Sequence, residues 1–316
     1  MAPFNLVIGP NGSGKTSLIQ AILQLRTLAR LPLREPAADG ERRPEGAEIT
    51  FRFQPPFDAL EASLGCVSDT VCDLLQVTPL LRGEGSDNWE GLRARLLTMR
   101  SYSFSHEAIA SVSALKDGAE LAADGRNLAA VLALRRQNHP SAFARFTEEL
   151  FRMMPEYDDL SLRERPDHTV ELRLRLADGA EMIAFENLSQ GTLYSLAILA
   201  LVFDPAPPAV VCIEEVDRGI HPRLLRGIRD LLYRLSYPEA TGESREPVQV
   251  IATTHSPYLL DLFRDHPEEI VITEKHGRAA HFTRLCDHAD LAGLLAEGSL
   301  GDLWFSGILG GVPDEP

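Results

Sequence analysis

The sequence predicts an α/β fold with a mostly parallel core sheet, and two observations indicate it. The first is an apolar run at residues 4–8, followed by a glycine-rich loop and by helical apolar spacing over residues 17–31. The second is the continuous apolar run at residues 209–213 and a later β-run at residues 248–254, each of which leads into polar residues. Continuous apolar runs of this length are typical of strands that are buried on both faces, as in parallel sheets.

The composition is that of an ordinary globular protein. The 316 residues are 44% hydrophobic and 24% charged, which fits one large domain or a domain with an insertion. The net charge of −15 disfavours nucleic acid binding by the surface as a whole, although a local basic patch could still bind it. No apolar run approaches the length of about 20 residues that a membrane span needs, so no membrane association is expected.

The cysteines and the first residues bear on the cellular compartment. Cys66, Cys72, Cys212 and Cys286 show no metal-ligand spacing and predict no disulfide framework. Free thiols fit a reducing environment. No charged and apolar leader opens the chain, so we expect a cytoplasmic protein.

The loop after the first predicted strand reads G-P-N-G-S-G-K-T-S, which contains the pattern G-x-x-x-x-G-K-T. Its glycines let several backbone amides point at one place, and the following helix adds the positive end of its dipole. Lys15 would neutralise the β- and γ-phosphates of a nucleotide, and the Thr16 hydroxyl would bind Mg²⁺. A structural turn is the alternative, but strand, loop and helix in this order favour a nucleotide site. The residues expected around the phosphates are Gly9, Pro10, Asn11, Gly12, Ser13, Gly14, Lys15, Thr16 and Ser17.

Two adjacent acids, Glu214 and Glu215, follow the apolar run at residues 209–213. A phosphate loop needs a carboxylate on a neighbouring strand. Glu214 would hold the Mg²⁺ shell, and Glu215 would polarise the attacking water. Adjacent acids are common on any protein surface. Here the apolar run before them and the phosphate loop earlier in the chain favour a catalytic role.

Two further segments have ordinary explanations when each is taken alone. Residues 188–192 read L-S-Q-G-T before an apolar helix, where Ser189 would cap the helix and leave free amides behind it. The run at residues 248–254 ends at His255, and a lone histidine is usually just a polar residue at a strand terminus. The order of loop, cap, acids and histidine instead favours His255 as a sensor of the γ-phosphate.

Phosphate loop, L-S-x-G helix cap, tandem acids and strand-end histidine, in that order, resemble the ATP-binding-cassette (ABC) superfamily of ATPases. The match is closest to the soluble branch shared by SMC, RecF and OLD (overcoming-lysogenisation-defect) proteins, and to small stand-alone AAA-type ATPases related to OLD. Residues 213–222, I-E-E-V-D-R-G-I-H-P, and residues 253–257, T-T-H-S-P, carry this second resemblance. It implies a P-loop NTPase head with a mostly parallel core sheet, an antiparallel β subdomain and an inserted helical lobe.

The resemblance also implies a homodimer that forms on ATP binding, because heads of that superfamily hold ATP between them in a head-to-tail arrangement. Lys15 and Thr16 of one subunit would bind ATP and Mg²⁺. Ser189 and Gly191 of the other subunit would reach the γ-phosphate with the amides and dipole of their helix. A monomer would therefore hydrolyse ATP slowly.

The remaining roles follow from the same resemblance. Glu215 would be the general base, and His255 would hold the attacking water and the γ-phosphate in line. His221 falls in the loop that contacts the other subunit and would be structural or interfacial.

Three features depart from the superfamily pattern. Glu214 stands where most cassettes have Asp, which fits contact with Mg²⁺ through water. Only eight residues precede Gly9, so a strand and hairpin on the adenine side are expected to be absent or replaced. The glutamine that contacts the metal and couples nucleotide to movement is not obvious. Gln54 is the candidate, with an exposed strand-end residue as the alternative.

The segment between the phosphate loop and the cap reads as mainly helical. Residues 34–48 are rich in Pro, Gly and charge and predict an exposed loop. Residues 57–156 look largely helical without the sustained heptads of a coiled-coil arm. Within them, residues 127–136 and 141–154 predict two amphipathic helices, with Arg135 on a helix surface.

A β-hairpin and a short C-terminal segment complete the chain. Residues 167–176 alternate and turn into residues 181–185, which predicts a hairpin. Its arginines could face DNA or a partner, but a solvated strand face is favoured. Residues 269–274 and 281–285 predict two strands, and residues 289–297 predict a helix.

These elements predict a single head over residues 1–316. A lobe at residues 50–186 would be inserted in it, and residues 187–316 would carry the cap helix, acids, histidine and C-terminal segment. The resemblance implies an ATPase that uses ATP and Mg²⁺ and switches a separate effector in DNA repair or anti-phage defence. The alternatives are a nucleotide-gated binding module with little turnover and, less favoured, the motor of a membrane transporter.

Overall fold

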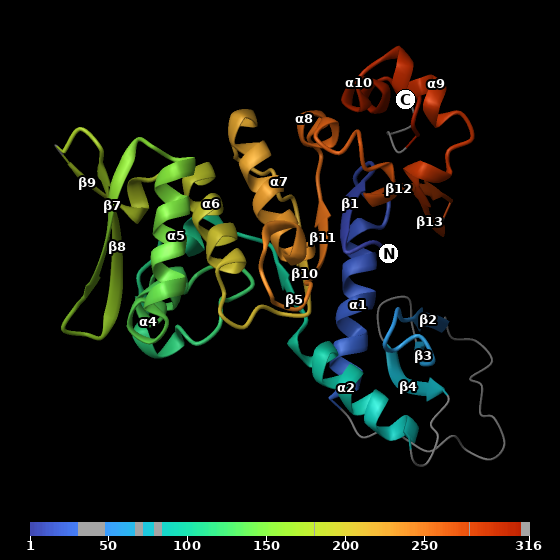
Figure 1. The fold of residues 1–316 in the computed structure, drawn as a ribbon, viewed down its shortest axis with the longest axis horizontal. Helices are drawn as coiled ribbons and strands as arrows, with labels where there is room; N and C mark the ends of the chain where they lie inside the picture. Colours follow the sequence, from blue (N-terminus) through green and yellow to red (C-terminus); the bar gives the residue numbers. More distant parts are fainter. Residues whose placement is uncertain (31–47, 67–71, 79–83, 180, 278, 311–316) are drawn as a thin grey trace. The chain divides into compact units, whose positions relative to one another are not determined.

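The computed structural model describes residues 1–30, 48–66, 72–78, 84–179, 181–277 and 279–310. The chain divides into two compact units. Unit 1 comprises Met1–Lys15, Ser101–Pro207 and Val211–Pro316, and unit 2 comprises Thr16–Arg100 and Pro208–Val210. Most of their helices and strands are labelled in Figure 1.

A six-stranded sheet forms the centre of unit 1, in the strand order β13-β12-β1-β11-β10-β5. The central strand β1 pairs in parallel with β11 on one side and with β12 on the other, and β13 runs antiparallel to β12. The predicted α/β fold with a mostly parallel core sheet is confirmed. The strands are β1 (Phe4–Ile8), β5 (Arg100–Tyr102), β10 (Val210–Ile213), β11 (Gln249–Thr253), β12 (Ile270–His276) and β13 (Ala279–Arg284).

The two helices α6 and α7 of unit 1 differ in how much of their surface is buried. Every residue from 191 to 202 of α6 (Gln190–Val202) is buried, because this helix is apolar around its whole circumference. By contrast, α7 (Pro222–Ser236) buries a stripe that includes Leu225, Ile228 and Leu232 and leaves Arg223 and Arg226 exposed. The shorter helices are α3 (His106–Ile109), α8 (Pro257–Asp261), α9 (Leu291–Glu297) and α10 (Leu300–Phe305).

No helix among the described residues is long and apolar enough to cross a membrane.

An antiparallel sheet also belongs to unit 1, with β8 at its centre and β6, β7 and β9 paired to it. The predicted hairpin is the pairing of β8 with β9. Two helices follow one another beside this sheet as predicted, and the break between them comes at Pro140, which cannot continue a helix. These elements are β6 (Ser113–Ala114), α4 (Leu128–Asn138), α5 (Pro140–Met153), β7 (Tyr157–Glu164), β8 (Thr169–Leu176) and β9 (Met182–Ala184).

Unit 2 holds a three-stranded antiparallel sheet in the order β2-β3-β4. The largely helical character expected for residues 57–156 is wrong for β3 and β4, since β3 alternates buried and half-buried side chains with a period of two. Only residue 48 of the loop predicted at residues 34–48 lies within the described residues, and it begins β2. The elements are α1 (Lys15–Ala29), β2 (Glu48–Arg52), β3 (Glu61–Cys66), β4 (Cys72–Thr78) and α2 (Glu84–Thr98).

The prediction of no disulfide is wrong. Cys66 and Cys72 form a disulfide in unit 2. They end β3 and begin β4, and the register of this antiparallel pair places them opposite each other. The other two cysteines are free thiols, and burial raises the pKa of Cys212 to about 12.

Arg135 is buried, and its predicted place on a helix surface is wrong. Its side chain is 9% exposed and donates to the carbonyl of Ala200 and to the Asp204 carboxylate, the latter at 2.5 Å. Both acceptors lie at the end of α6. Burial lowers the pKa of Arg135, and the carboxylate of Asp204 partly offsets this. The pair therefore joins α4 to α6 inside the apolar core.

Replacing Arg135 with alanine should lower the free energy of unfolding by about 3 kcal/mol, because it leaves a half-buried carboxylate and a buried carbonyl unpaired. Urea denaturation of the single variants and of the double variant with Asp204→Ala measures the coupling. The matched control is Arg126→Ala, whose ion pair with Asp124 is exposed. Equal stabilities for Arg135→Ala and the control would contradict the buried pair.

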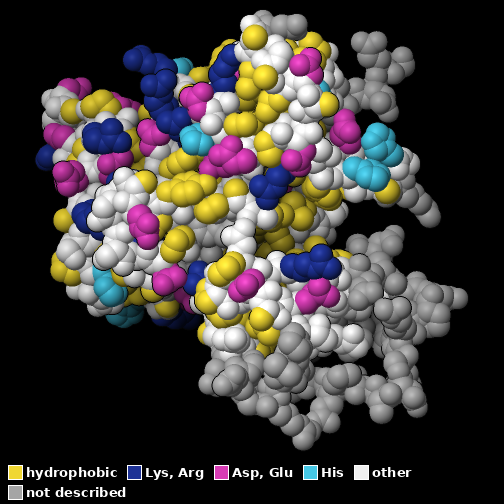
Figure 2. Space-filling model, turned by 45° about the vertical axis from the view of Figure 1, so that its right-hand side comes forward, with side chains coloured by type: hydrophobic (Ala, Val, Ile, Leu, Met, Phe, Trp, Pro, Cys, Tyr) yellow, Lys and Arg dark blue, Asp and Glu magenta, His cyan; other side chains and the backbone are white. Residues whose placement is uncertain are grey.

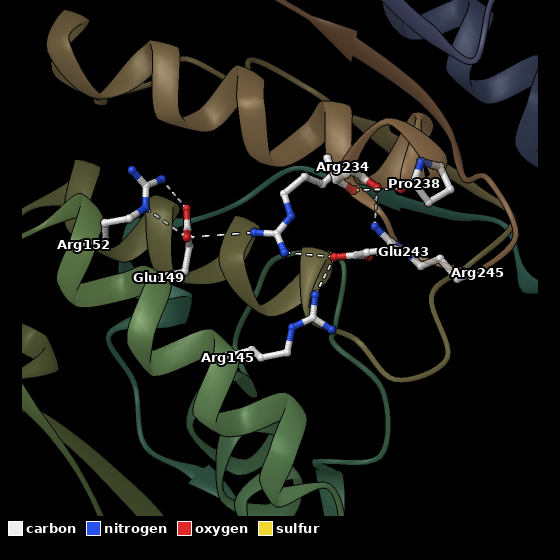
Figure 3. A network of polar contacts seen from close by, with 8 residues as sticks. Arg145, Glu149, Arg152, Arg234, Pro238, Glu243 and Arg245 are labelled. Carbon is white, nitrogen blue, oxygen red and sulfur yellow. Dashed lines mark hydrogen bonds and ion pairs between the residues drawn. The ribbon is translucent and has the colours of Figure 1, made fainter.

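A network of ion pairs joins α5 to the segment after α7 (Figure 3). The Glu243 carboxylate contacts the guanidiniums of Arg145 at 2.5 Å, Arg245 at 2.8 Å and Arg234 at 2.9 Å. Burial alone would raise the pKa of Glu243, but the three arginines hold it below its usual value. These arginines form ion pairs within the protein, so the cluster does not by itself indicate a nucleic-acid site.

Candidate functional site

The phosphate loop lies between β1 and α1 and contacts β12. Gly9, Gly12 and Gly14 all have positive φ, at 149°, 77° and 107°. A Cβ at Gly9 would lie 2.2 Å from Thr273 Oγ1, so only glycine fits there. The Ser13 hydroxyl lies 2.5 Å from the Thr273 hydroxyl, which donates to the carbonyl of Ile8 at 3.1 Å. Thr273 therefore holds the loop to the neighbouring strand.

The Lys15 ammonium lies over the loop that precedes it. It donates to the carbonyl of Gly9 at 2.7 Å and to that of Pro10 at 2.9 Å. Burial lowers the pKa of Lys15, and the Glu215 carboxylate partly offsets this. The two carbonyls are acceptors that phosphate oxygens could replace, because a phosphate offers stronger, charged acceptors to the same ammonium.

Glu215 is held in an unusual backbone conformation just after β10. Its φ is 49°, in the left-handed region that residues other than glycine seldom adopt, at a cost of about 1–3 kcal/mol. Its N–H donates to Thr253 Oγ1 at 2.9 Å, and the next N–H, of Val216, donates to the Thr253 carbonyl at 3.0 Å. Strand β11 thus fixes the turn, while the Glu215 side chain stays about half exposed, 3.5 Å from Arg218. Strain of this kind is frequent at functional sites.

His255 follows the end of β11 and is exposed. Partial burial lowers its pKa, Lys15 lowers it further, and the carboxylates of Asp217 and Glu215 act in the opposite direction. The residue before it, Thr254, donates its hydroxyl to the Asp217 carboxylate at 2.5 Å. Asp217 was not predicted to belong to the site. Its position two residues after Glu215, within a polar turn, was the available signal.

The structure brings Lys15, Glu215 and His255 together. They follow β1, β10 and β11, which are consecutive in the sheet and lie side by side in Figure 1. The Glu215 carboxylate acts on the pKa of Lys15, and the charges of Lys15 and Glu215 both act on the pKa of His255. A cation, an exposed carboxylate and an imidazole of lowered pKa at one sheet edge can bind an anion and accept a proton beside it.

The predicted helix cap forms at Ser189. Its hydroxyl accepts from the N–H of Thr192 at 3.2 Å and lies 2.8 Å from the Thr192 hydroxyl. A Cβ at Gly191 would lie 2.4 Å from the carbonyl oxygen of Gly219, and Gly219 in turn contacts the Gln190 side chain. The cap therefore packs on the turn that carries Asp217, which is a contact that the sequence did not reveal.

The residues predicted to contact Mg²⁺, and Ser17 beside them, are divided between the two units. Thr16, Ser17 and Gln54 belong to unit 2, and their side chains are exposed. Glu214 is half-buried, and its N–H donates to the carbonyl of Tyr102 on β5 at 2.9 Å. Hydroxyl, carboxylate and amide oxygens are hard donors of the kind that Mg²⁺ prefers. The donor types therefore fit the predicted metal.

Comparisons with known proteins indicate the family and the fold of the chain. Residues 4–261 match the family described as "AAA domain, putative AbiEii toxin, Type IV TA system". None of the curated proteins matches the chain. The fold is similar to that of an SMC head bound to the C-terminal winged-helix domain of ScpA, at 16% identity and a TM-score of 0.52, covering 89% of this chain and 90% of that one. An SMC head domain from Thermotoga maritima matches at 14% identity and a TM-score of 0.47, covering 89% of each chain. The chain belongs to the AAA-domain family named above, and its fold is similar to that of an SMC head domain.

Proposed function

We propose that this protein hydrolyses ATP with Mg²⁺ in a head-to-tail homodimer and uses the cycle to switch a separate effector. The observation that supports this most directly is the electrostatic coupling of Lys15, in the loop after β1, with Glu215 and His255, which follow the neighbouring strands β10 and β11. Those three side chains supply a phosphate-binding cation, a base and a neutral imidazole, which are groups that position and activate water beside a γ-phosphate.

Lys15, Glu215 and His255 each have a different role in the proposed reaction. Lys15 exchanges its contacts with the carbonyls of Gly9 and Pro10 for the β- and γ-phosphates. Glu215 accepts a proton from water as the water attacks the γ-phosphorus and ADP leaves. His255, neutral because its pKa is lowered, hydrogen-bonds the γ-phosphate and keeps water and phosphorus in line.

Mg²⁺ would be held by Thr16 and Glu214, with Gln54 as the third proposed contact. Bound there, the ion would supply positive charge that offsets the negative charge of the nucleotide's phosphates. The longer carboxylate of Glu214, compared with an aspartate, is consistent with contact through a water molecule.

The second subunit completes the site in this proposal. Ser189 and Gly191 begin α6, whose first amides and positive dipole end would face the γ-phosphate of the other subunit. Because the Gly191 cap touches Gly219, movement of the cap on dimer formation would reach the turn that carries Asp217. Asp217 holds Thr254 beside His255, so the two sites of a dimer would be coupled.

The effector and its setting are part of the proposal. The family description includes a putative toxin of a type IV toxin–antitoxin system, which supports a role in defence. On the face shown in Figure 2, acidic and basic side chains are interspersed and do not form one large basic patch. Together with the net charge of −15, this favours a protein effector over nucleic acid.

The pH dependence of hydrolysis should show a neutral His255. Its pKa lies below the ordinary 6.5, so the rate should hold as the pH falls to 6.5 and decline only below it. Between the lowered pKa of His255 in the folded protein and its ordinary pKa in the unfolded chain, the unfolded state binds more protons. The free energy of unfolding therefore decreases as the pH falls through this range, and His255 does not change it at higher pH. Phosphate release measured across this range, with His255→Gln as a control that lacks this titration, tests the assignment. A decline centred above 6.5 that is absent from the control would contradict it.

Steady-state phosphate release against protein concentration tests the proposed function as a whole. Hydrolysis completed by a second subunit should rise faster than linearly at low concentration and require Mg²⁺. A nucleotide-gated module would bind ATP with negligible release at every concentration. A rate that is strictly linear from the lowest concentration, in a protein that stays monomeric with ATP, would exclude the dimer.

A further inference from the structure

One face of the β12–β13 hairpin lies along the phosphate loop. In the register of this antiparallel pair, Thr273 is opposite Phe282 and Lys275 is opposite Ala280. Directly opposed residues of an antiparallel pair have their side chains on the same face, and residues two apart share it, so these four side chains form one face. Thr273 is the residue whose hydroxyl contacts Ser13.

The two β13 residues of this face, Ala280 and Phe282, lie against the phosphate loop at Gly14. A Cβ on Gly14 would lie 2.7 Å from Cβ of Ala280 and 3.6 Å from Cζ of Phe282. The phenyl ring therefore lies beside the residue that immediately precedes Lys15. Lys275, opposite Ala280, is exposed and adds a positive charge to the same face.

Phe282 combines this position with exposure. Its side chain is 42% exposed, on β13, which is the edge strand of the central sheet. A single exposed aromatic residue needs no explanation by itself. An exposed ring that flanks a phosphate loop is different, because a nucleotide held by its phosphates must place its base within reach of the loop's surroundings, and bases stack on aromatic faces.

We propose that Phe282 is the stacking platform for the base of the bound nucleoside triphosphate, with Lys275 on the sugar–phosphate side of the same face. This subsite rests on the proposed function, since it assumes that phosphates occupy the loop. Stacking needs only a π-face and reads no hydrogen-bond pattern, so Phe282 contributes equally to ATP and GTP. Any preference between the two bases comes from other residues.

Binding of ATP and of inorganic tripolyphosphate, which has phosphates but no base, separates the platform from the loop. Titration calorimetry with Phe282→Ala should give about ten-fold weaker ATP binding and unchanged tripolyphosphate binding. Phe282→Trp should retain ATP affinity, and its added indole fluorescence should be quenched by ATP but not by tripolyphosphate. Phe305→Ala removes an aromatic residue that is 83% exposed on α10 and serves as the matched control, with no change for either ligand.

The outcomes distinguish three cases. If Phe282→Ala binds ATP as tightly as the wild type, or loses affinity for ATP and tripolyphosphate equally, the ring only packs against the loop and the platform is wrong. If the wild type binds tripolyphosphate and loses it with Lys15→Ala, the phosphate site stands whatever Phe282 does. If the wild type binds neither ligand, the proposed function fails and the platform fails with it.

Discussion

Replacing Glu215 with glutamine should lower the rate of ATP hydrolysis by about 100- to 10,000-fold while leaving ATP binding intact. Glutamine keeps the size and hydrogen-bonding shape of the side chain but cannot take a proton from water. The unusual backbone at Glu215 is set by contacts of its own N–H and that of Val216 with Thr253, which the substitution does not touch. The loss should therefore be one of chemistry and not of folding.

Single-turnover phosphate release and ATP binding, measured on the same preparation, separate these effects. The Glu215→Gln dimer should also persist with ATP, because the bound nucleotide is no longer consumed. Glu239→Gln is the matched control, since Glu239 is an exposed acid outside the site. Hydrolysis by Glu215→Gln at the wild-type rate would show that another group is the base.

Replacing Lys15 with alanine should weaken ATP binding roughly 100-fold, corresponding to about 2.7 kcal/mol. The ammonium is the charge that the phosphates meet at the loop, and it is already held there by two carbonyls. Its removal leaves the loop with only neutral backbone amides to offer the phosphates. Because hydrolysis requires bound nucleotide, phosphate release should be lost as well.

Nucleotide titration of the purified variant measures the change in affinity. Lys116→Ala removes an exposed lysine outside the site and should bind ATP normally. Thermal unfolding of both variants without nucleotide checks that the fold is retained. If Lys15→Ala binds ATP with wild-type affinity, the loop does not hold the phosphates.

The core of the fold and most of the candidate site could be predicted because each depends on local signals. Parallel strands buried on both faces leave continuous apolar runs, and the residue that follows each run lies at the sheet edge. This rule found Glu215 and His255 before the structure placed them together. The Ser189 cap could be predicted in the same way, since a hydroxyl before a helix satisfies that helix's own amides.

The parts that could not be predicted depend on contacts distant in the sequence. Arg135 is buried because its partner Asp204, 69 residues away, neutralises it. The Ser13 hydroxyl meets that of Thr273 across 260 residues, and neither residue type signals the other. Cys66 and Cys72 pair because of a strand register, and β3 is too short for its alternation to outweigh a helical pattern.

Mixing two inactive variants tests most directly whether each site is built from two subunits. Lys15→Ala lacks a working phosphate loop but keeps its cap, whereas Ser189→Arg keeps its loop but blocks its cap. About half of the dimers in an equimolar mixture pair the two variants, and each such dimer contains one complete site. Phosphate release by the mixture should therefore rise to about a quarter of the wild-type rate. If the mixture is shown to form mixed dimers, a rate of phosphate release no higher than the sum of the rates of the two variants measured alone would contradict a site shared between subunits.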